Sequence, residues 1–200
     1  MNSKGRSNTS AIRFVTVTGI FSAAAFVLFC LEFPLPFLIP PFIKFDFSDI
    51  PALIGAFAMG PVCGILVELI KNLLGVLTSG SFGVGEISNF LLGAVFTGTA
   101  GAIYHFNRTK KGAMIASLTG AAAMALFSLP ANYFVVYPVY YNFMPKETIL
   151  AAYQAILPSV DSIFKSLLIF NLPFTFFKGI VAALITFLIY KPLSPLLKGR

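Results

Sequence analysis

Long apolar stretches that are almost free of charge constrain this chain more than any other feature. Residues 11–31 carry a single charge, Arg13, and residues 87–106 carry no Lys, Arg, Asp or Glu. Each stretch is about as long as the ~20 residues that an α-helix needs to cross the hydrocarbon core of a bilayer. Of the 200 residues, 58% are hydrophobic and 10% are charged, whereas soluble domains carry roughly 25% charged residues. The chain is therefore predicted to be an all-α integral membrane protein.

The apolar segments divide into a predicted six-helix transmembrane bundle. This single domain is expected to cover residues 11–196, after a disordered polar cytoplasmic tail at residues 1–10. Helices are expected at residues 11–31, 48–60, 61–78, 86–106, 113–142 and 165–190. Gly60-Pro61 interrupts one apolar run, and we interpret it as a tight reversal between two helices rather than as a kink within one.

The distribution of charge favours six membrane crossings with both termini in the cytoplasm. The pieces predicted to be cytoplasmic hold nine of the fourteen basic residues and none of the seven acids. The outer pieces hold most of the acids, and their only cations are Lys44, Lys146 and Lys165. An odd number of spans would put one basic tail outside, against the positive-inside bias. Loops near anionic lipid thus explain the net charge of +7, and no nucleic-acid partner is expected.

Two outer segments are predicted to be structured. Residues 32–47 hold four prolines in an apolar, aromatic-rich run, which is typical of a packed loop or short hairpin over the mouth of the bundle. Residues 146–157 have the pattern of a short amphipathic helix at the outer interface, ended by Pro158. Ser48 and Asp49 are expected to cap the second helix of the bundle.

The motifs of several enzyme classes are missing from the sequence. It contains no P-loop, no HExxH and no GxSxG, so ATP hydrolysis at a P-loop and metalloprotease or serine-hydrolase chemistry are not expected. Cys30 and Cys63 lack CxxC spacing and are interpreted as buried apolar thiols rather than as a disulfide or a metal site. Neither a metal nor a cofactor is expected.

Polar side chains inside apolar helices are the main candidates for function, because they are costly in lipid. Asn171, Thr175 and Lys178 follow i, i+4, i+7 spacing and therefore share one face of the last helix. Lys178 is expected near the membrane midplane. There it needs a polar ligand or a carboxylate, for which Glu68 is a candidate. Asn132 lies within the fifth helix between two prolines.

Further polar residues stand at the outer entrance of the fourth helix, at Glu86 and Asn89. Because the helices alternate in direction, the polar sets of the last three helices converge in the outer half of the bundle. This convergence predicts a pocket open to the outside. The proline-rich loop would form its lid, with Phe42 and Asp46 among the binding residues. The alternative is that the asparagine and threonine side chains only hydrogen-bond the helices to one another.

Two helical pairs complete the candidate features. Glu68 and Lys71 stand three residues apart on the third helix and are expected to form an ion pair. Gly19 and Ala23 on the first helix make a small-xxx-small step, which lets another helix approach closely. Similar steps on the fourth and fifth helices are expected in internal packing, whereas the step on the first helix is a candidate docking face for a partner subunit.

Four segments of the chain resemble a known family. They are FPLPFLIPPFIKFDFSDIPALIGAFAMGP (33–61), VELIKNLLGVL (67–77), GVGEISNFLLG (83–93) and NLPFTFFKG (171–179). Together they resemble the riboflavin-specific substrate-binding subunits (S components) of energy-coupling-factor (ECF) vitamin transporters. The similarity runs from about residue 11 to residue 196.

This resemblance implies a function and a set of partners. It implies a six-helix bundle in the cell membrane of a bacterium, which captures riboflavin outside the cell beneath the first loop. It also implies a transmembrane coupling subunit and two cytoplasmic ATPase subunits as partners, and no enzymatic activity in the chain itself. The flavin-holding positions of the family map onto Asn132 and Lys178, while a position that is usually asparagine is Thr175 here. One flavin hydrogen bond is therefore expected to be lost, or passed to water or Asn171.

Other functions stay open at the level of the sequence. A sister subunit for another vitamin, such as thiamine or a pterin, would share much of the pattern. A small intramembrane enzyme could use Asp46, Glu86 or Lys178, and a structural or assembly protein would need no ligand. Riboflavin is favoured because a flavin ring is flat, apolar on both faces and polar at its edge, which matches a pocket of aromatic residues with a few donors. The small number of outer cations also suits an uncharged vitamin.

Overall fold

Helices make up most of the computed structural model, which describes residues 3–198 and the side chains of residues 10–189. The longer helices are α1 (Ser3–Cys30), α2 (Asp49–Met59), α3 (Pro61–Val76), α4 (Val84–Phe106), α5 (Lys110–Ala131) and α9 (Leu172–Lys198). The shorter elements are β1 (Phe33–Pro34), β2 (Lys44–Phe45), α6 (Tyr137–Tyr140), α7 (Lys146–Gln154), α8 (Ile163–Ser166) and two π-helical turns, η1 (Asn132–Val136) and η2 (Leu167–Asn171).

Four helical segments among the described residues are long and apolar enough to cross a membrane: residues 10–30, 84–106, 110–140 and 163–189. Their surfaces carry large apolar side chains, such as Ile20, Phe134 and Leu188, which are 63%, 72% and 76% exposed. So much exposed apolar area would be unfavourable in water and is expected of helices that face lipid. The chain is thus a helical membrane protein, as the sequence predicts.

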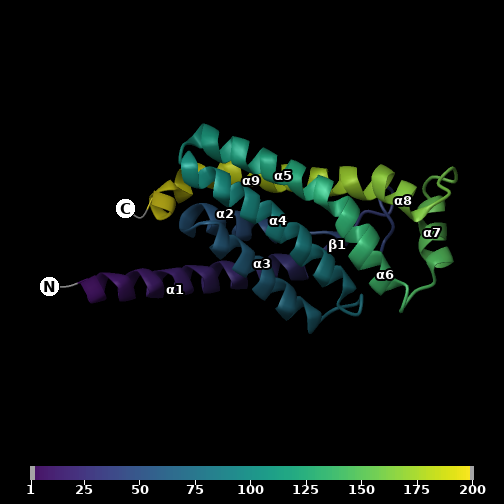
Figure 1. The fold of residues 1–200 in the computed structure, drawn as a ribbon, viewed down its shortest axis with the longest axis horizontal. Coiled ribbons are helices and arrows are strands. Elements are labelled where there is room, and N and C mark those ends of the chain that lie inside the picture. The colour runs from purple at the N-terminus through teal and green to yellow at the C-terminus, as the bar shows by residue number, and fades with distance from the viewer. Residues whose placement is uncertain (1–2, 199–200) are drawn as a thin grey trace.

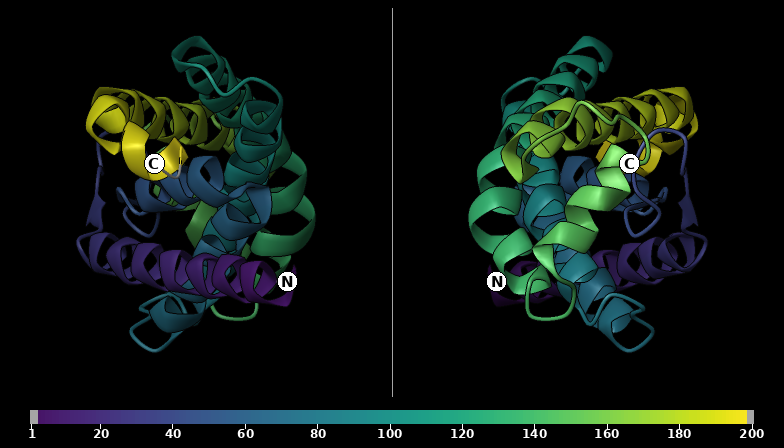
Figure 2. Two further views of the ribbon diagram at one scale, coloured as in Figure 1. Left: turned by 90° about the vertical axis from the view of Figure 1, so that its left-hand side faces the viewer. Right: turned by 90° about the vertical axis from the view of Figure 1, so that its right-hand side faces the viewer.

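The long helices run roughly along the longest axis of the molecule, and the two ends of the chain lie at the same end of the bundle (Figure 1). The antiparallel hairpin of β1 and β2 lies toward the opposite end, together with α6, α7 and α8, and we call this the hairpin end. There α7 lies crosswise to the long helices (Figures 1 and 2). Helix α4 packs against both α3 and α5, and α5 packs against α9.

The chain reverses at Gly60-Pro61 rather than kinking within one helix. Gly60 has a φ of 99°, which glycine adopts readily because it lacks a Cβ. Pro61 then opens α3, where its missing N–H has no helical partner to lose. Helices α2 and α3 pack so closely that a Cβ added at Gly64 would lie 2.7 Å from the Cβ of Ala56. The interpretation of this step as a reversal is therefore correct.

The small-residue steps fall into two kinds. On α4, a Cβ added at Gly101 would lie 2.8 Å from the Cα of Pro61, so this glycine serves helix packing as expected. On α1, a Cβ added at Gly19 would meet nothing within 4 Å, and Ala23 is exposed as well. The step on α1 therefore makes no close helix contact among the described residues.

The segment 32–47 contains a short antiparallel hairpin in which Phe33 pairs with Phe45 and Pro34 pairs with Lys44. The amphipathic segment that follows the fifth helix forms α7, which buries Ile149 and Tyr153, four residues apart. Both elements lie at the hairpin end (Figure 1). They place apolar and aromatic side chains over that end of the bundle.

Three local expectations from the sequence are wrong. Helix α1 begins at Ser3, so it runs through most of the segment that we expected to be a disordered polar tail; residues 1–2 lie outside the described part of the chain. Cys30 is exposed rather than buried, although Cys63 is buried as expected. The predicted fifth and sixth helices are each interrupted by a π-helical turn.

These two π-helical turns share one cause. The N–H of Tyr137 donates to the carbonyl of Asn132, and the N–H of Leu172 donates to the carbonyl of Leu167, five residues back in each case. Each of these donors is followed directly by a proline, Pro138 or Pro173. A proline cannot donate to the preceding turn, which weakens the α-helical hydrogen-bond ladder at that point and accommodates the wider turn. Asn132 opens η1 and Asn171 closes η2, so two of the three asparagines that were singled out in the sequence lie at such a turn.

Candidate binding pocket

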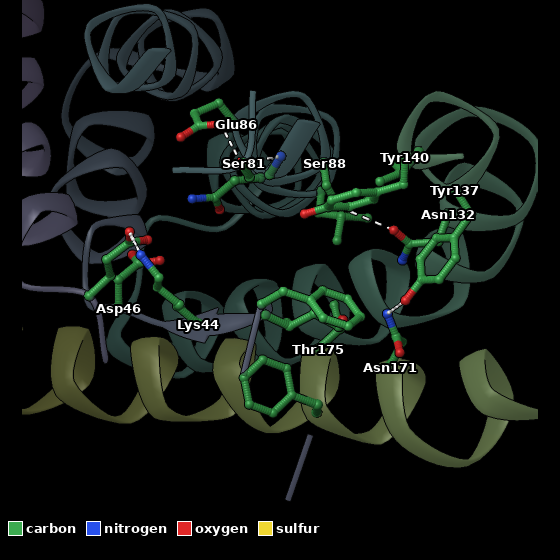
Figure 3. A pocket seen from close by; sticks show the side chains of 18 of the residues that line it. Lys44, Asp46, Ser81, Glu86, Ser88, Asn132, Tyr137, Tyr140, Asn171 and Thr175 are labelled. Carbon is green, nitrogen blue, oxygen red and sulfur yellow. Dashed lines mark hydrogen bonds and ion pairs between the residues drawn. The ribbon is translucent and has the colours of Figure 1, made fainter. Parts of the chain in front are cut away.

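A pocket at the hairpin end lies between residues 32–47, which we call the hairpin segment, and α4, η1, η2 and the start of α9. It is lined by all eight binding residues that the sequence predicts. They are Phe42, Asp46, Glu86, Asn89, Asn132, Asn171, Thr175 and Lys178. Figure 3 shows Asn132, Tyr137 and Asn171 together at one end of the pocket, with Asp46 at the other. The structure thus brings the predicted residues together, and their contact with a ligand stays a prediction.

Lys178 is paired with carboxylates of the hairpin segment and of α2. Its Nζ lies 2.9 Å from Oδ2 of Asp46 and 3.3 Å from Oδ2 of Asp49, and it donates to Oδ1 of Asn89 at 3.1 Å. Only 12% of its side chain is exposed. Lys178 therefore has the carboxylate partner that its position requires. That partner is not Glu68, which we considered from the sequence.

This ion pair belongs to a larger buried network of charge. On α3, the Nζ of Lys71 lies 2.6 Å from Asp49 and 2.8 Å from Glu68, and it donates to the Ser48 hydroxyl at 2.5 Å. The predicted Glu68–Lys71 ion pair is thereby confirmed. The side chains of Lys71, Asp49 and Glu68 are at most 2% exposed. Ions buried this deeply are tolerated only when they are paired, so each charge depends on its neighbours.

The same network ties the hairpin segment to the bundle. Asp46 follows β2 directly, and its Oδ1 accepts hydrogen bonds from the backbone N–H and the hydroxyl of Ser48, at 2.8 and 2.5 Å. Its Oδ2 faces Lys178 on α9. The expectation that Ser48 and Asp49 cap α2 is wrong: no side-chain cap bond forms, because the Ser48 hydroxyl and the Asp49 carboxylate serve this network instead.

Two further carboxylates, Glu32 and Glu86, line the pocket. The buried Oε2 of Glu86 accepts from the hydroxyls of Ser79 and Ser81, at 2.9 and 3.1 Å. Glu32 pairs with Lys44 at 2.5 Å, with 28% and 40% of the two side chains exposed. Sequence reasoning missed the pairing of Glu32 with Lys44, because the two residues lie twelve positions apart on segments with no regular period.

The two asparagines are held by hydroxyl groups. The Ser88 hydroxyl donates to Oδ1 of Asn132 at 3.2 Å. The Tyr153 hydroxyl donates to Oδ1 of Asn171 at 2.6 Å, and Nδ2 of Asn171 donates to the Tyr137 hydroxyl at 3.3 Å. Burial raises the pKa of Tyr153, which lies in α7 outside the membrane-spanning segments, well above its usual value, so its hydroxyl stays protonated. Sequence reasoning gave Ser88 and Tyr153 no role, since neither residue type is unusual where it stands.

Aromatic rings cover the space between these polar groups. The ring of Phe42 lies 5.8 Å from that of Tyr140 and 6.2 Å from that of Tyr153, measured between centroids. The ring of Phe45 lies 6.1 Å from that of Phe174, which also lines the pocket. Apolar walls with a few fixed polar groups are the usual composition of a small-molecule site. This one fits a flat, largely apolar ligand with polar edges.

Comparisons with known proteins bear on the function of this pocket. A family model described as "ECF transporter, substrate-specific component" matches residues 13–190. Riboflavin transporter RibU of Staphylococcus aureus (strain TCH60) is 37% identical over 202 residues, which covers 99% of each chain. Riboflavin transporter FmnP of Bacillus subtilis (strain 168) is 34% identical, over 92% of this chain and 93% of the relative.

A solved structure is similar as well. It is described as "Structure and mechanism of the S component of a bacterial ECF transporter" and matches with a TM-score of 0.74 at 37% sequence identity. The match covers 94% of this chain and 99% of that one. The chain therefore belongs to the substrate-specific components of ECF transporters. It is a transporter component and not an enzyme, and the family resemblance found in the sequence is confirmed.

The buried ion pair predicts coupled effects of mutation on stability. Lys178→Met leaves Asp46 and Asp49 with one cation fewer, and breaking a buried pair costs roughly 3–5 kcal/mol. We expect a clear fall in the melting temperature of the detergent-solubilised, ligand-free protein. In the double variant with Asp46→Asn, the surplus negative charge is removed and much of the lost stability should return.

The exposed pair Asp161–Lys165, 3.2 Å apart, supplies a control for this experiment. Lys165→Met removes a lysine of the same helical segment, and the melting temperature should change little because surface ion pairs contribute little to stability. If the losses from Asp46→Asn and Lys178→Met simply add, the two residues do not act as a pair.

Proposed function

We propose that the pocket captures riboflavin from outside the cell and that the chain is the riboflavin-specific component of an ATP-driven ECF transporter. The observation that carries the proposal is the similarity, over nearly the whole chain, to transporters named for riboflavin. The pocket, with its aromatic walls and polar ends, agrees with that ligand. Riboflavin joins a flat ring system with a polar edge to an uncharged polyol chain. The pocket offers surfaces for both parts.

The charge of the pocket also supports an uncharged ligand. Among the described residues, the lysines that line it are Lys44 and Lys178, and each lies within hydrogen-bonding distance of a carboxylate. Glu86 adds a further acidic group. A ligand with several phosphates would meet no free cation among these residues and would be repelled by the carboxylates. A neutral vitamin meets no such penalty.

Four residues are proposed to form hydrogen bonds with the polar edge of the flavin: Asn132, Asn171, Thr175 and Lys178. Three of them line the pocket one after another, from Asn171 at the end of η2 to Thr175 and Lys178 in α9, and Asn132 reaches the pocket from η1. Thr175 is shorter than the asparagine usual at this family position and has no amide. We expect Asn171, one helical turn away, to take over the hydrogen bond that Thr175 cannot make. Phe42, Asp46, Glu86 and Asn89 complete the proposed site.

Flavin binding tests this function directly. The purified chain should carry yellow flavin or quench riboflavin fluorescence on titration. Asn132→Leu should weaken affinity about fivefold, because a neutral hydrogen bond typically contributes about 1 kcal/mol. Asn142→Leu, the same substitution at an exposed asparagine beyond α6, should leave affinity unchanged. A folded wild-type chain that does not bind riboflavin would refute the function.

We further propose that residues 11–196 form one domain in the cell membrane, with six crossings in which α2 and α3 count as two. Residues 1–10 and the C-terminus would lie in the cytoplasm. The loop between α4 and α5, which carries Arg108, lies at the same end of the bundle as the two ends of the chain, and α7 lies at the opposite end (Figure 1). This arrangement agrees with the distribution of basic residues. The side chains of Lys4, Arg6, Lys191, Lys198 and Arg200 lie outside the described residues.

Cysteine labelling tests this topology. In a background without Cys30 and Cys63, a single cysteine at residues 107–112 should react with a membrane-impermeant reagent only from the cytoplasmic side. A single cysteine at residues 146–150 should react only from outside, because α7 would cover the outer mouth. Labelling from the opposite sides would invert the topology and close the pocket to external substrate.

The proposed partners are a transmembrane coupling subunit and two cytoplasmic ATPase subunits, since the sequence of the chain contains no P-loop. The exposed step at Gly19 and Ala23 on α1 is the proposed docking face for the coupling subunit. Small residues there would let a partner helix approach closely. Gly19 and Ala23 are open to such an approach, because a Cβ added at Gly19 would meet nothing within 4 Å and Ala23 is exposed.

Bulky substitutions on α1 should therefore separate uptake from binding. Gly19→Phe or Ala23→Leu should leave riboflavin affinity unchanged but reduce ATP-driven uptake in vesicles that contain the coupling module. Leu184→Phe, a bulky change at an exposed position of α9, should affect neither. If Gly19→Phe lowers binding as much as uptake, the step belongs to the fold rather than to a docking face.

A further inference from the structure

Three side chains from separate elements form a closed ring of hydrogen bonds at one end of the pocket. Tyr137 comes from α6, Tyr153 from α7 and Asn171 from η2. Besides the two hydrogen bonds of Asn171 described above, the hydroxyls of Tyr137 and Tyr153 are bonded to each other. All three side chains are at most 6% exposed. Asn171 and Tyr137 line the pocket, whereas Tyr153 is not among its lining residues.

The two bond lengths at Asn171 agree with a single orientation of its amide. O–H···O bonds in proteins are commonly about 2.7–2.8 Å and N–H···O bonds about 2.9–3.0 Å. The contact of 2.6 Å with Tyr153 therefore suits the amide oxygen, and the contact of 3.3 Å with Tyr137 suits the amide nitrogen. The reverse orientation would place the N–H in a contact that is too short for it.

Counting protons then gives the ring a single direction. Tyr153 has one hydroxyl proton and donates it to Asn171, so its oxygen must accept the proton of Tyr137. The oxygen of Tyr137 in turn accepts from Nδ2 of Asn171. Each member donates once and accepts once. The amide retains one unused N–H, and Figure 3 shows its nitrogen turned toward Tyr137 and the pocket, with its oxygen turned away.

We infer that Tyr153 is a positioning residue for substrate recognition: it holds the amide of Asn171 in one orientation, so that Asn171 presents an N–H donor to a carbonyl or ring nitrogen at the polar edge of the ligand. A freely flipping amide would present donor and acceptor in turn and would discriminate poorly between ligand edges. The inference deepens the proposed function and rests on it.

Tyr153 is suited to this role by its place in the fold. It is fully buried, and together with Ile149 it anchors α7 over the end of the bundle. Its ring also meets the ring of Phe42 from the hairpin segment, edge to face at 6.2 Å between centroids. The position of α7 at the end of the bundle and the orientation of the Asn171 amide are thus set by the same side chain.

A double-mutant cycle tests this inference by riboflavin titration. Tyr153→Phe deletes the hydroxyl but keeps the ring that packs against Phe42, and it should raise the Kd for riboflavin about five- to tenfold. In an Asn171→Leu background the same change should raise the Kd no further, because no amide is left to hold. Tyr133→Phe, which removes an exposed hydroxyl from η1, is the matched control and should leave the Kd unchanged.

Each other outcome is decisive. An unchanged Kd for Tyr153→Phe, an unchanged Kd for Asn171→Leu, or an equal rise from Tyr153→Phe in both backgrounds would overturn the inference and leave riboflavin binding itself intact. Absence of binding by the wild-type chain would instead refute the proposed function. If Tyr153→Phe does not fold, Tyr137→Phe breaks the ring at its other hydroxyl, and its effect should likewise vanish in the Asn171→Leu background.

Discussion

Charges buried away from water decide how the parts of this bundle meet. Three carboxylates and two lysines form one connected network. Its members are Asp46 beside the hairpin, Asp49 on α2, Glu68 and Lys71 on α3, and Lys178 on α9. Removing such ions from water costs several kcal/mol each unless every one finds a partner. The helices and the hairpin segment can therefore pack only in an arrangement that brings these five groups together, and that arrangement also forms one end of the pocket.

The network gives Lys178 two roles that depend on one another. Its ammonium group neutralises Asp46, which fixes the hairpin segment, and the same side chain lines the pocket. A ligand atom that accepts a hydrogen bond from Lys178 therefore competes with, or adds to, its contact with Asp46. Binding in the pocket and the position of the hairpin segment are coupled through this one amine. Replacing it alters the fold as well as the site, so a loss of ligand affinity at Lys178 needs a stability measurement beside it.

Much of this architecture follows from local rules that act on the sequence. Uncharged apolar blocks must be helices in lipid, and Gly60-Pro61 supplies the positive φ and the missing N–H that suit a reversal. The polar binding residues predicted from the sequence line the pocket, because polar groups in a membrane turn away from lipid. The pairing of Lys178 with Asp46 could not be predicted in this way, since the two residues are 132 positions apart. Capping rules assigned Ser48 and Asp49 to the end of α2, because such rules consider only sequence neighbours and not a lysine from another helix.

The π-helical turns show how irregular backbone can serve recognition. A regular helix offers polar groups to a pocket only at intervals of three or four residues, and its carbonyls are all in use. Where a proline follows, the ladder relaxes into a wider turn, and in both cases that turn carries an asparagine at the pocket. The wider turn adds one residue and so changes the register of the side chains beyond it. Hydroxyl groups from other elements hold both of these amides, as Ser88 donates to Asn132 and Tyr153 donates to Asn171.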